Sequence, residues 1–233
     1  MEKNRFNEYL NFFREALPIV QSFDIGERNV VIGGREAYLY YVDGFLQSEI
    51  MEQLFQSLFS VDKHEMNQRK NVEDFIKHHM PYAQAKAEKD TDKILTALLS
   101  GLIILVIDGY SETIVADLRT YPVRGVDEPE KEKSLRGAKD GFVETILFNT
   151  NLIRRRIRDP NLIFEMLTVG ARSRTDVCIG YIKGMADEKL VHKVRDLIGG
   201  IRQDTLTVGD QSLVEAIGRP KWVNPLPKVR YTQ

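Results

Sequence analysis

The sequence predicts an α/β (α+β) fold made of two small subdomains, each a mixed or antiparallel sheet packed with helices. First, short β-branched runs alternate with amphipathic helical segments along the chain. Second, residues 1–120 hold 13 Lys and Arg against 19 Asp and Glu, whereas residues 121–233 hold 20 against 15. Third, residues 121–133 contain two prolines and almost no apolar periodicity, which is typical of a linker. We therefore expect subdomains at residues 1–120 and 121–233.

The first half begins with a helix expected over residues 4–17, which Pro18 ends or bends. Its apolar face holds Phe6, Tyr9, Leu10, Phe13 and Leu17. Strands at 29–32 and 35–42 flank Gly33 and Gly34, a two-residue hairpin signal. The remaining expectations are a helix at 48–59, a loop at 61–71, helices at 72–79 and 91–100, and strands at 102–107 and 112–118 joined by a hairpin at 108–111.

The second half begins with a helix expected over residues 140–158, capped by Asp140 and ended by Asp159-Pro160. We expect its apolar stripe to form the core of the second subdomain. The stripe consists of Phe142, Ile146, Ile153 and Ile157, widened by Val143, Leu147 and Leu152. Four arginines occupy the last turns, where the helix dipole favours positive charge. They are either a solvated helix end or a docking surface.

An antiparallel strand pair is expected next, at 162–169 and 176–182, turning at 170–174. Asp187 then caps a helix at 188–198 with Leu190, Val191, Val194 and Leu197 directed inward. A short strand at 205–208, a helix at 211–217 and an extended tail from Arg219 complete the expected order.

The residue chemistry points to no enzyme, metal or cofactor. His78 and His79 are adjacent and point apart, and neither His64 nor His192 has a ligand at helical spacing. The glycine pairs match no phosphate loop, and no serine lies in a nucleophile elbow. The single cysteine, Cys178, cannot form an internal disulfide and has no recognisable paired histidine, so we expect it to be buried and inert.

Partner classes follow from charge and hydropathy. A net charge of −1 and an arginine run without interleaved aromatics argue against nucleic-acid binding. Arginine pairs well with carboxylates, which the acidic first half of a neighbouring subunit would offer.

No signal peptide opens the chain. The longest apolar run, 94–107, is shorter than the ~20 residues that a membrane-spanning helix needs, so we expect no span in this chain.

Five stretches of the second half carry a family resemblance. They are Arg136-Gly137, residues 140–144 (DGFVE), Asn149, residues 152–159 (LIRRRIRD) and residues 172–177 (RSRTDV). Together they resemble the signature of the GerA family of bacterial spore germination proteins. The closing run, residues 222–233, resembles one branch of the family more than its nutrient-receptor A subunits. The sequence departs from the family at Ala138, often proline, and at Leu226, usually phenylalanine.

The resemblance implies a non-enzymatic cytosolic N-terminal domain of a spore inner-membrane protein, lying on the cytoplasmic side. Such a domain would assemble or gate an ion-release channel during germination, as a homo-oligomer and with other spore inner-membrane germination proteins. The alternative is a germinant-receptor A subunit domain whose inter-subdomain cleft binds a small nutrient. The interaction candidates are Arg136, Gly137, Glu144, Asn149, Arg154, Arg155, Arg156, Arg158, Ser173, Thr175 and Asp176. The last three would alternatively organise a turn.

Overall fold

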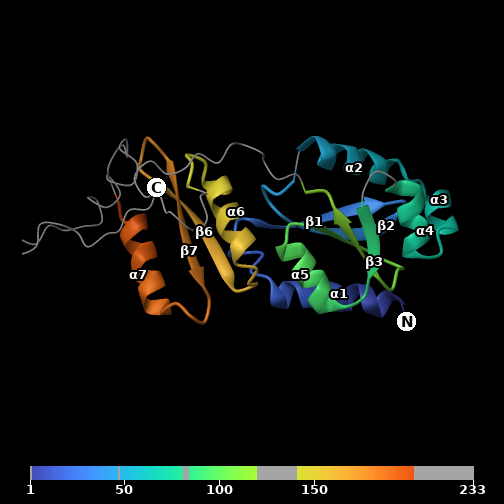
Figure 1. Cartoon of the computed structure of the whole chain (residues 1–233), viewed down its shortest axis with the longest axis horizontal. Coiled ribbons are helices and arrows are strands. Elements are labelled where there is room, and N and C mark those ends of the chain that lie inside the picture. The colour runs from blue at the N-terminus through green and yellow to red at the C-terminus, as the bar shows by residue number, and fades with distance from the viewer. Residues whose placement is uncertain (1, 47, 81–83, 120–140, 202–233) are drawn as a thin grey trace, which may run out of the picture.

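The computed structural model describes residues 2–46, 48–80, 84–119 and 141–201, and it contains two sheets packed with helices. The sheets lie toward opposite ends of an elongated molecule (Figure 1). We call the described residues up to 119 the first unit and residues 141–201 the second unit. This mixed α/β architecture confirms the predicted fold class. The boundary at 120/121 stays a prediction, because it falls among residues that the structure does not describe.

The first unit is built on a five-stranded antiparallel sheet in the order β1-β2-β4-β5-β3. Its central strand β4 is buried along its whole length, and its side chains alternate between two cores. The strands are β1 (Ile25–Ile32), β2 (Arg35–Val42), β3 (Gln84–Glu88), β4 (Ile103–Ile107) and β5 (Thr113–Asp117).

Helices cover both faces of this sheet. On one face, α1 (Glu2–Ala16) and α5 (Thr91–Leu99) pack in one core. The opposite core takes α2 (Ser48–Ser60), α3 (Lys63–Gln68) and α4 (Val72–His79). All five apolar residues expected on the buried face of α1 are buried, which confirms the face that helical spacing predicted.

The predicted β1–β2 hairpin is confirmed. Ile32 pairs with Arg35, and both intervening glycines have positive φ (+54° and +80°), as a two-residue turn that follows the strand twist requires. The strand expected at 29–32 begins at Ile25, and two further first-unit expectations differ from the structure. Residues 63–68 form α3 instead of a loop, because Asp62 accepts a hydrogen bond from the Glu65 amide at 2.7 Å and Met66 is buried. Strand β3 was not expected, because its short, partly charged sequence becomes a strand only by pairing with β5.

The second unit is the pair β6 (Leu162–Val169) and β7 (Thr175–Ile182) with α6 (Ile146–Arg156) and α7 (Glu188–Gly199) on either side (Figure 1). The strand pair, its turn and the Asp187 cap are confirmed. The linker, the expected strand at 205–208, the expected helix at 211–217 and the tail lie outside the described residues. No helix in the described part of the chain is both long and apolar enough for a membrane crossing.

The expected burial of α6 is wrong. The helix begins at Ile146 after Thr145, so Asp140 is not its cap. Phe142 is 47% exposed, Ile157 is also exposed, and Ile146 and Ile153 are only half-buried. The buried positions are instead polar: Thr150, Asn151 and Arg154. Helical spacing identified an apolar stripe, but the helix turns its polar side to the first unit.

The expected burial of α7 is wrong in part. Ile198 packs into the small core of the second unit, against Val169. Leu190 and Leu197, expected to point inward, are 58% and 41% exposed.

Candidate functional site

The two units meet at the segment 18–24, which leads from α1 to β1. Pro18 follows the last turn of α1, and the chain then runs along β6. The Phe23 amide donates to the Phe164 carbonyl at 3.0 Å, and the Phe164 amide donates to the Ser22 hydroxyl oxygen at 2.9 Å. The segment therefore bonds to the β6 strand of the second unit although it belongs to the first.

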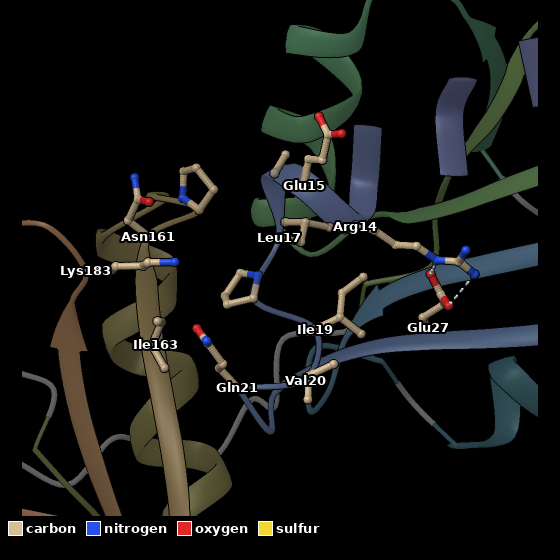
Figure 2. A pocket seen from close by; sticks show the side chains of 13 residues that line it. Arg14, Glu15, Leu17, Ile19, Val20, Gln21, Glu27, Asn161, Ile163 and Lys183 are labelled. Carbon is tan, nitrogen blue, oxygen red and sulfur yellow. Dashed lines mark hydrogen bonds and ion pairs between the residues drawn. The ribbon is translucent and has the colours of Figure 1, made fainter. Parts of the chain in front are cut away.

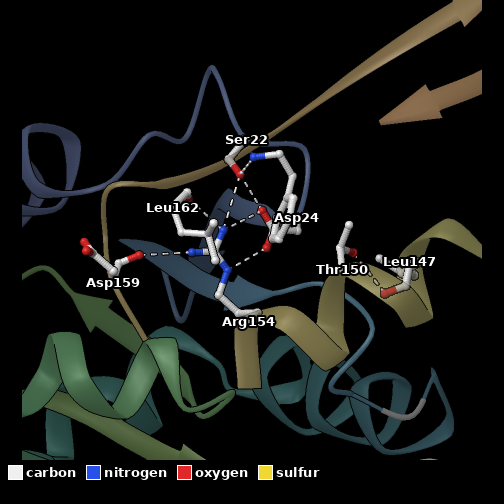
Figure 3. A network of polar contacts seen from close by, with 8 residues as sticks. Ser22, Asp24, Leu147, Thr150, Arg154, Asp159 and Leu162 are labelled. Carbon is white, nitrogen blue, oxygen red and sulfur yellow. Dashed lines mark hydrogen bonds and ion pairs between the residues drawn. The ribbon is translucent and has the colours of Figure 1, made fainter. Parts of the chain in front are cut away.

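A buried ion pair lies beside these bonds (Figure 3). Arg154 Nε donates to Asp24 Oδ2 at 2.9 Å, and Arg154 Nη2 donates to Asp24 Oδ1 at 3.1 Å. Both side chains are 0% exposed. A planar guanidinium matches a carboxylate in this two-bond geometry, which lysine cannot reproduce. The pair joins residues 130 positions apart in sequence.

The remaining polar groups of the pair are also bonded. Arg154 Nη1 donates to the Asp159 carbonyl at 3.2 Å, and Nη2 donates to the Leu162 carbonyl at 3.0 Å. The Ser22 hydroxyl donates to Asp24 Oδ1 at 2.5 Å. The guanidinium carbon lies 5.1 Å from the centre of the Phe164 ring, within cation–π range. This set of bonds offsets the desolvation cost of burying two charges.

A close backbone approach accompanies the ion pair. Gly44, in the turn after β2, has a φ of +80°, and a Cβ placed there would lie 2.1 Å from Nδ2 of Asn151 on α6. The adjacent Asp43 amide donates to the Asp24 carbonyl at 2.7 Å. Only glycine fits this position, both for its backbone angle and for the space left by α6. Helix α6 therefore contacts the first unit at Gly44 and at Asp24.

Two clefts open along the 18–24 segment. The first, which we call the α1 cleft, has a volume of about 470 Å³ and lies between the end of α1 and β6 (Figure 2). The first unit contributes the ion pair between Arg14 and Glu27 (3.2 Å), and the second contributes Asn161 and Lys183. Pro18 and Ile163 are among its apolar residues. The cleft is large enough for a small polar molecule.

The second cleft, about 450 Å³, is lined by residues 19–23 together with β6 residues and Arg195 of α7. Glu165 accepts from Arg195 Nη2 at 2.6 Å and from the Tyr181 hydroxyl at 2.5 Å. The hydrogen bond from Arg195 holds the pKa of Glu165 below its usual range, and burial raises the pKa of Tyr181 to about 12. At neutral pH this cleft therefore presents a fixed carboxylate–guanidinium pair, and the Tyr181 phenol bonded to Glu165 is neutral.

The structure places two sets of the interaction candidates toward opposite ends of β6. Arg155, Arg156 and Arg158 are exposed near the end of α6, before β6 begins, whereas Arg154 is buried. The other group lies in or beside the β6–β7 turn, about 25 Å away along an eight-residue strand. There Thr175 donates to Ser173 at 3.1 Å and Thr168 donates to Asp176 at 3.0 Å, which are bonds that organise a turn.

The remaining candidates precede α6 or lie within it. Glu144 is exposed, and the Asn149 amide bonds to both the NH and the carbonyl of Val143 (2.8 and 2.6 Å), which fixes the chain entering the helix. Arg136 and Gly137 lie outside the described residues. Ser22 and Asp24 were missed altogether, because a serine and an aspartate between two elements carry no periodic signal. The sequence carried one signal of a buried polar contact: Arg154 lies on the same side of its helix as Thr150 and Asn151.

Groups that could support other chemistry are sparse in the described ranges. Among those residues, no three His, Cys, Asp or Glu side chains are placed to hold a metal ion together. Cys178 is half-buried and not fully buried as expected, and burial raises its pKa to about 11. Its thiol is therefore protonated at neutral pH and weakly nucleophilic.

Known proteins match this chain over most of its length. The profile of the family described as Bacillus/Clostridium GerA spore germination protein matches residues 12–233. Stage V sporulation protein AF of Bacillus subtilis is 37% identical over 222 residues, covering 95% of this chain and 45% of that protein. Spore germination protein KA of B. subtilis is 26% identical over 216 residues, covering 92% of this chain and 38% of that protein. The chain thus spans less than half the length of these relatives.

A solved structure is also similar. The N-terminal domain of the A subunit of the Bacillus megaterium spore germinant receptor GerK3 matches with a TM-score of 0.63 and 25% identity, over 84% of this chain and 71% of that one. The likeness to stage V sporulation protein AF confirms the branch that residues 222–233 indicated. These matches and the shared fold lead to one conclusion: the chain belongs to the GerA family of spore germination proteins.

Proposed function

We propose that this chain is the cytosolic, non-enzymatic N-terminal domain of a spore inner-membrane protein, and that it assembles or gates an ion-release channel during germination. Family membership supports the germination context. The observation that carries the domain's own role is the contact between its units. One buried ion pair and the hydrogen bonds of Phe164 to Ser22 and Phe23 join the two cores of the first unit to the small core of the second. Such a contact can transmit a change in one unit to the other.

The exposed arginines after the buried one supply a surface for a neighbouring subunit. Arg155 and Arg156 follow Arg154 on α6 and are exposed, so a partner on this side would meet positive charge next to the ion pair. The first unit of another copy offers exposed carboxylates. Arginine at an interface gains from bidentate pairing with such groups. Copies held together in a membrane assembly would need only weak contacts of this kind.

Charge reversal tests this surface. The variant Arg155→Glu with Arg156→Glu is expected to leave the isolated chain folded, because both side chains are exposed, but to impair ion release in spores carrying the full-length protein. A compensating acidic-to-basic change on the first unit should restore release. The matched control is Lys86→Glu with Lys93→Glu, two exposed lysines of the first unit. Normal release from the arginine variant would contradict the assignment.

A second candidate function is binding of a small nutrient, as in a germinant-receptor A subunit. The α1 cleft favours it, since both units line it and the similar GerK3 domain comes from a germinant receptor. A thermal-shift screen with amino acids and sugars tests it. A ligand at a hundred times its dissociation constant would add about 2.7 kcal/mol to the free energy of unfolding.

Two separate lysine variants serve as the comparison for that screen. Lys183→Ala should weaken the shift, because Lys183 lines the α1 cleft, whereas Lys189→Ala on α7 should not. No shift with any compound, or equal shifts in both variants, would remove this second function.

A further inference from the structure

The apolar side of helix α7 is wider than the part of it that packs against the strand pair. Ile198 is buried against β6 and Val194 packs beside it, which accounts for one side of the helix. Leu190 and Leu197 are largely exposed, and Met185 in the turn before the helix is 81% exposed. These three residues are among the large apolar residues that are exposed to water in the described part of the chain. Exposed apolar groups gathered on one element mark an interaction site more often than scattered ones do.

Two lysines share this exposed side. At 3.6 residues per turn, Lys189, Lys193, Leu197 and Leu190 fall within one arc of about 100°. Both lysines are exposed. Glu188 lies outside the arc and Asp196 borders it next to Lys189. The arc therefore combines apolar groups with positive charge at their margin, and it carries no acidic residue between them. We call these four residues the α7 face.

Among the described residues, none covers the α7 face, whose side chains are exposed. Helix α7 lies on the side of β6–β7 away from α6 and the first unit (Figure 1). Arg195 of α7 lines the second cleft but lies outside the arc, and no residue of the α7 face lines either cleft. A flat partner could approach α7 without displacing any contact described above.

We propose that the α7 face docks on the surface of an anionic lipid bilayer. The leucines would insert at the boundary between headgroups and acyl chains, and the lysines would lie near lipid phosphates. The inference rests on the proposed membrane location. Two apolar side chains are too few for a stable protein interface, which needs about 800 Å² from each partner. On a lipid surface these side chains need no complementary pocket, and the two lysines add electrostatic attraction to anionic headgroups.

Vesicle flotation of the 233-residue chain tests the proposal. The chain should float with phosphatidylglycerol vesicles, less so as salt is raised, and not with phosphatidylcholine vesicles. Leu190→Asp with Leu197→Asp should lower the bound fraction by about tenfold, and Lys189→Glu with Lys193→Glu by a similar factor. Both variants should keep the melting temperature of the parent chain. The matched control, Val31→Asp with Lys86→Glu, changes an exposed apolar residue and an exposed lysine of the first unit and should float normally.

Three results would overturn the proposal. They are equal flotation with both lipids, absence of flotation, and unchanged flotation of the α7 variants. If the chain does not float but self-associates, and the leucine variant abolishes that association, a second copy covers the α7 face instead. These outcomes are separate from the proposed function, since vesicle binding is measured without ion release and the arginine surface is untouched.

Discussion

Replacing Asp24 with alanine is expected to lower the free energy of unfolding by about 3–5 kcal/mol, because the Arg154 guanidinium then stays buried without its carboxylate. The loss should appear as a lower midpoint in urea melts of the 233-residue chain. Arg155→Ala is the matched control on the same helix. Its side chain is exposed, so its effect should stay within about 0.5 kcal/mol.

A double variant separates charge from packing. Asp24→Leu with Arg154→Met removes both buried charges and should recover much of the stability lost in Asp24→Ala, because no unpaired charge remains. The recovered chain should still fail in spores if the ion pair sets the relation between the units. A cost of Asp24→Ala below about 1 kcal/mol would mean that water reaches Arg154, in disagreement with its complete burial.

Replacing Phe164 with alanine is expected to cost about 3–5 kcal/mol. Its ring is buried on β6, lies under the Arg154 guanidinium, and fills the space above Gly180. Truncation would leave a cavity beside the ion pair and remove the cation–π contact. The control is Phe142→Ala, because Phe142 is 47% exposed, and it should cost less than about 1 kcal/mol.

Urea melts of the two variants measure which phenylalanine contributes more to the free energy of unfolding. Equal losses would mean that Phe142, on the stripe that helical spacing favoured, contributes as much as Phe164. A larger loss for Phe164 would place the stabilising contacts of the second unit at β6 and Arg154, as the burial of those side chains indicates.

The sequence by itself determined the elements whose signal is local. The α1 face follows from helical spacing, the β1–β2 hairpin from two adjacent glycines, and the β6–β7 pair from β-branched runs around a polar turn. Each signal is set by backbone angles or by a periodic pattern within a few residues. Family membership was also readable, because its motifs are contiguous in sequence.

Only the tertiary structure decided which side of α6 is buried. Periodicity favours the apolar stripe, but Asp24, 130 positions away, pairs with Arg154 and draws the polar side of the helix inward. A buried charge is stable only when a partner is placed to satisfy it, and the placement depends on how the two units pack. The same holds for α7, where the small second-unit core leaves Leu190 and Leu197 in water. The long-range partner sets the burial of these side chains, and no local pattern specifies it.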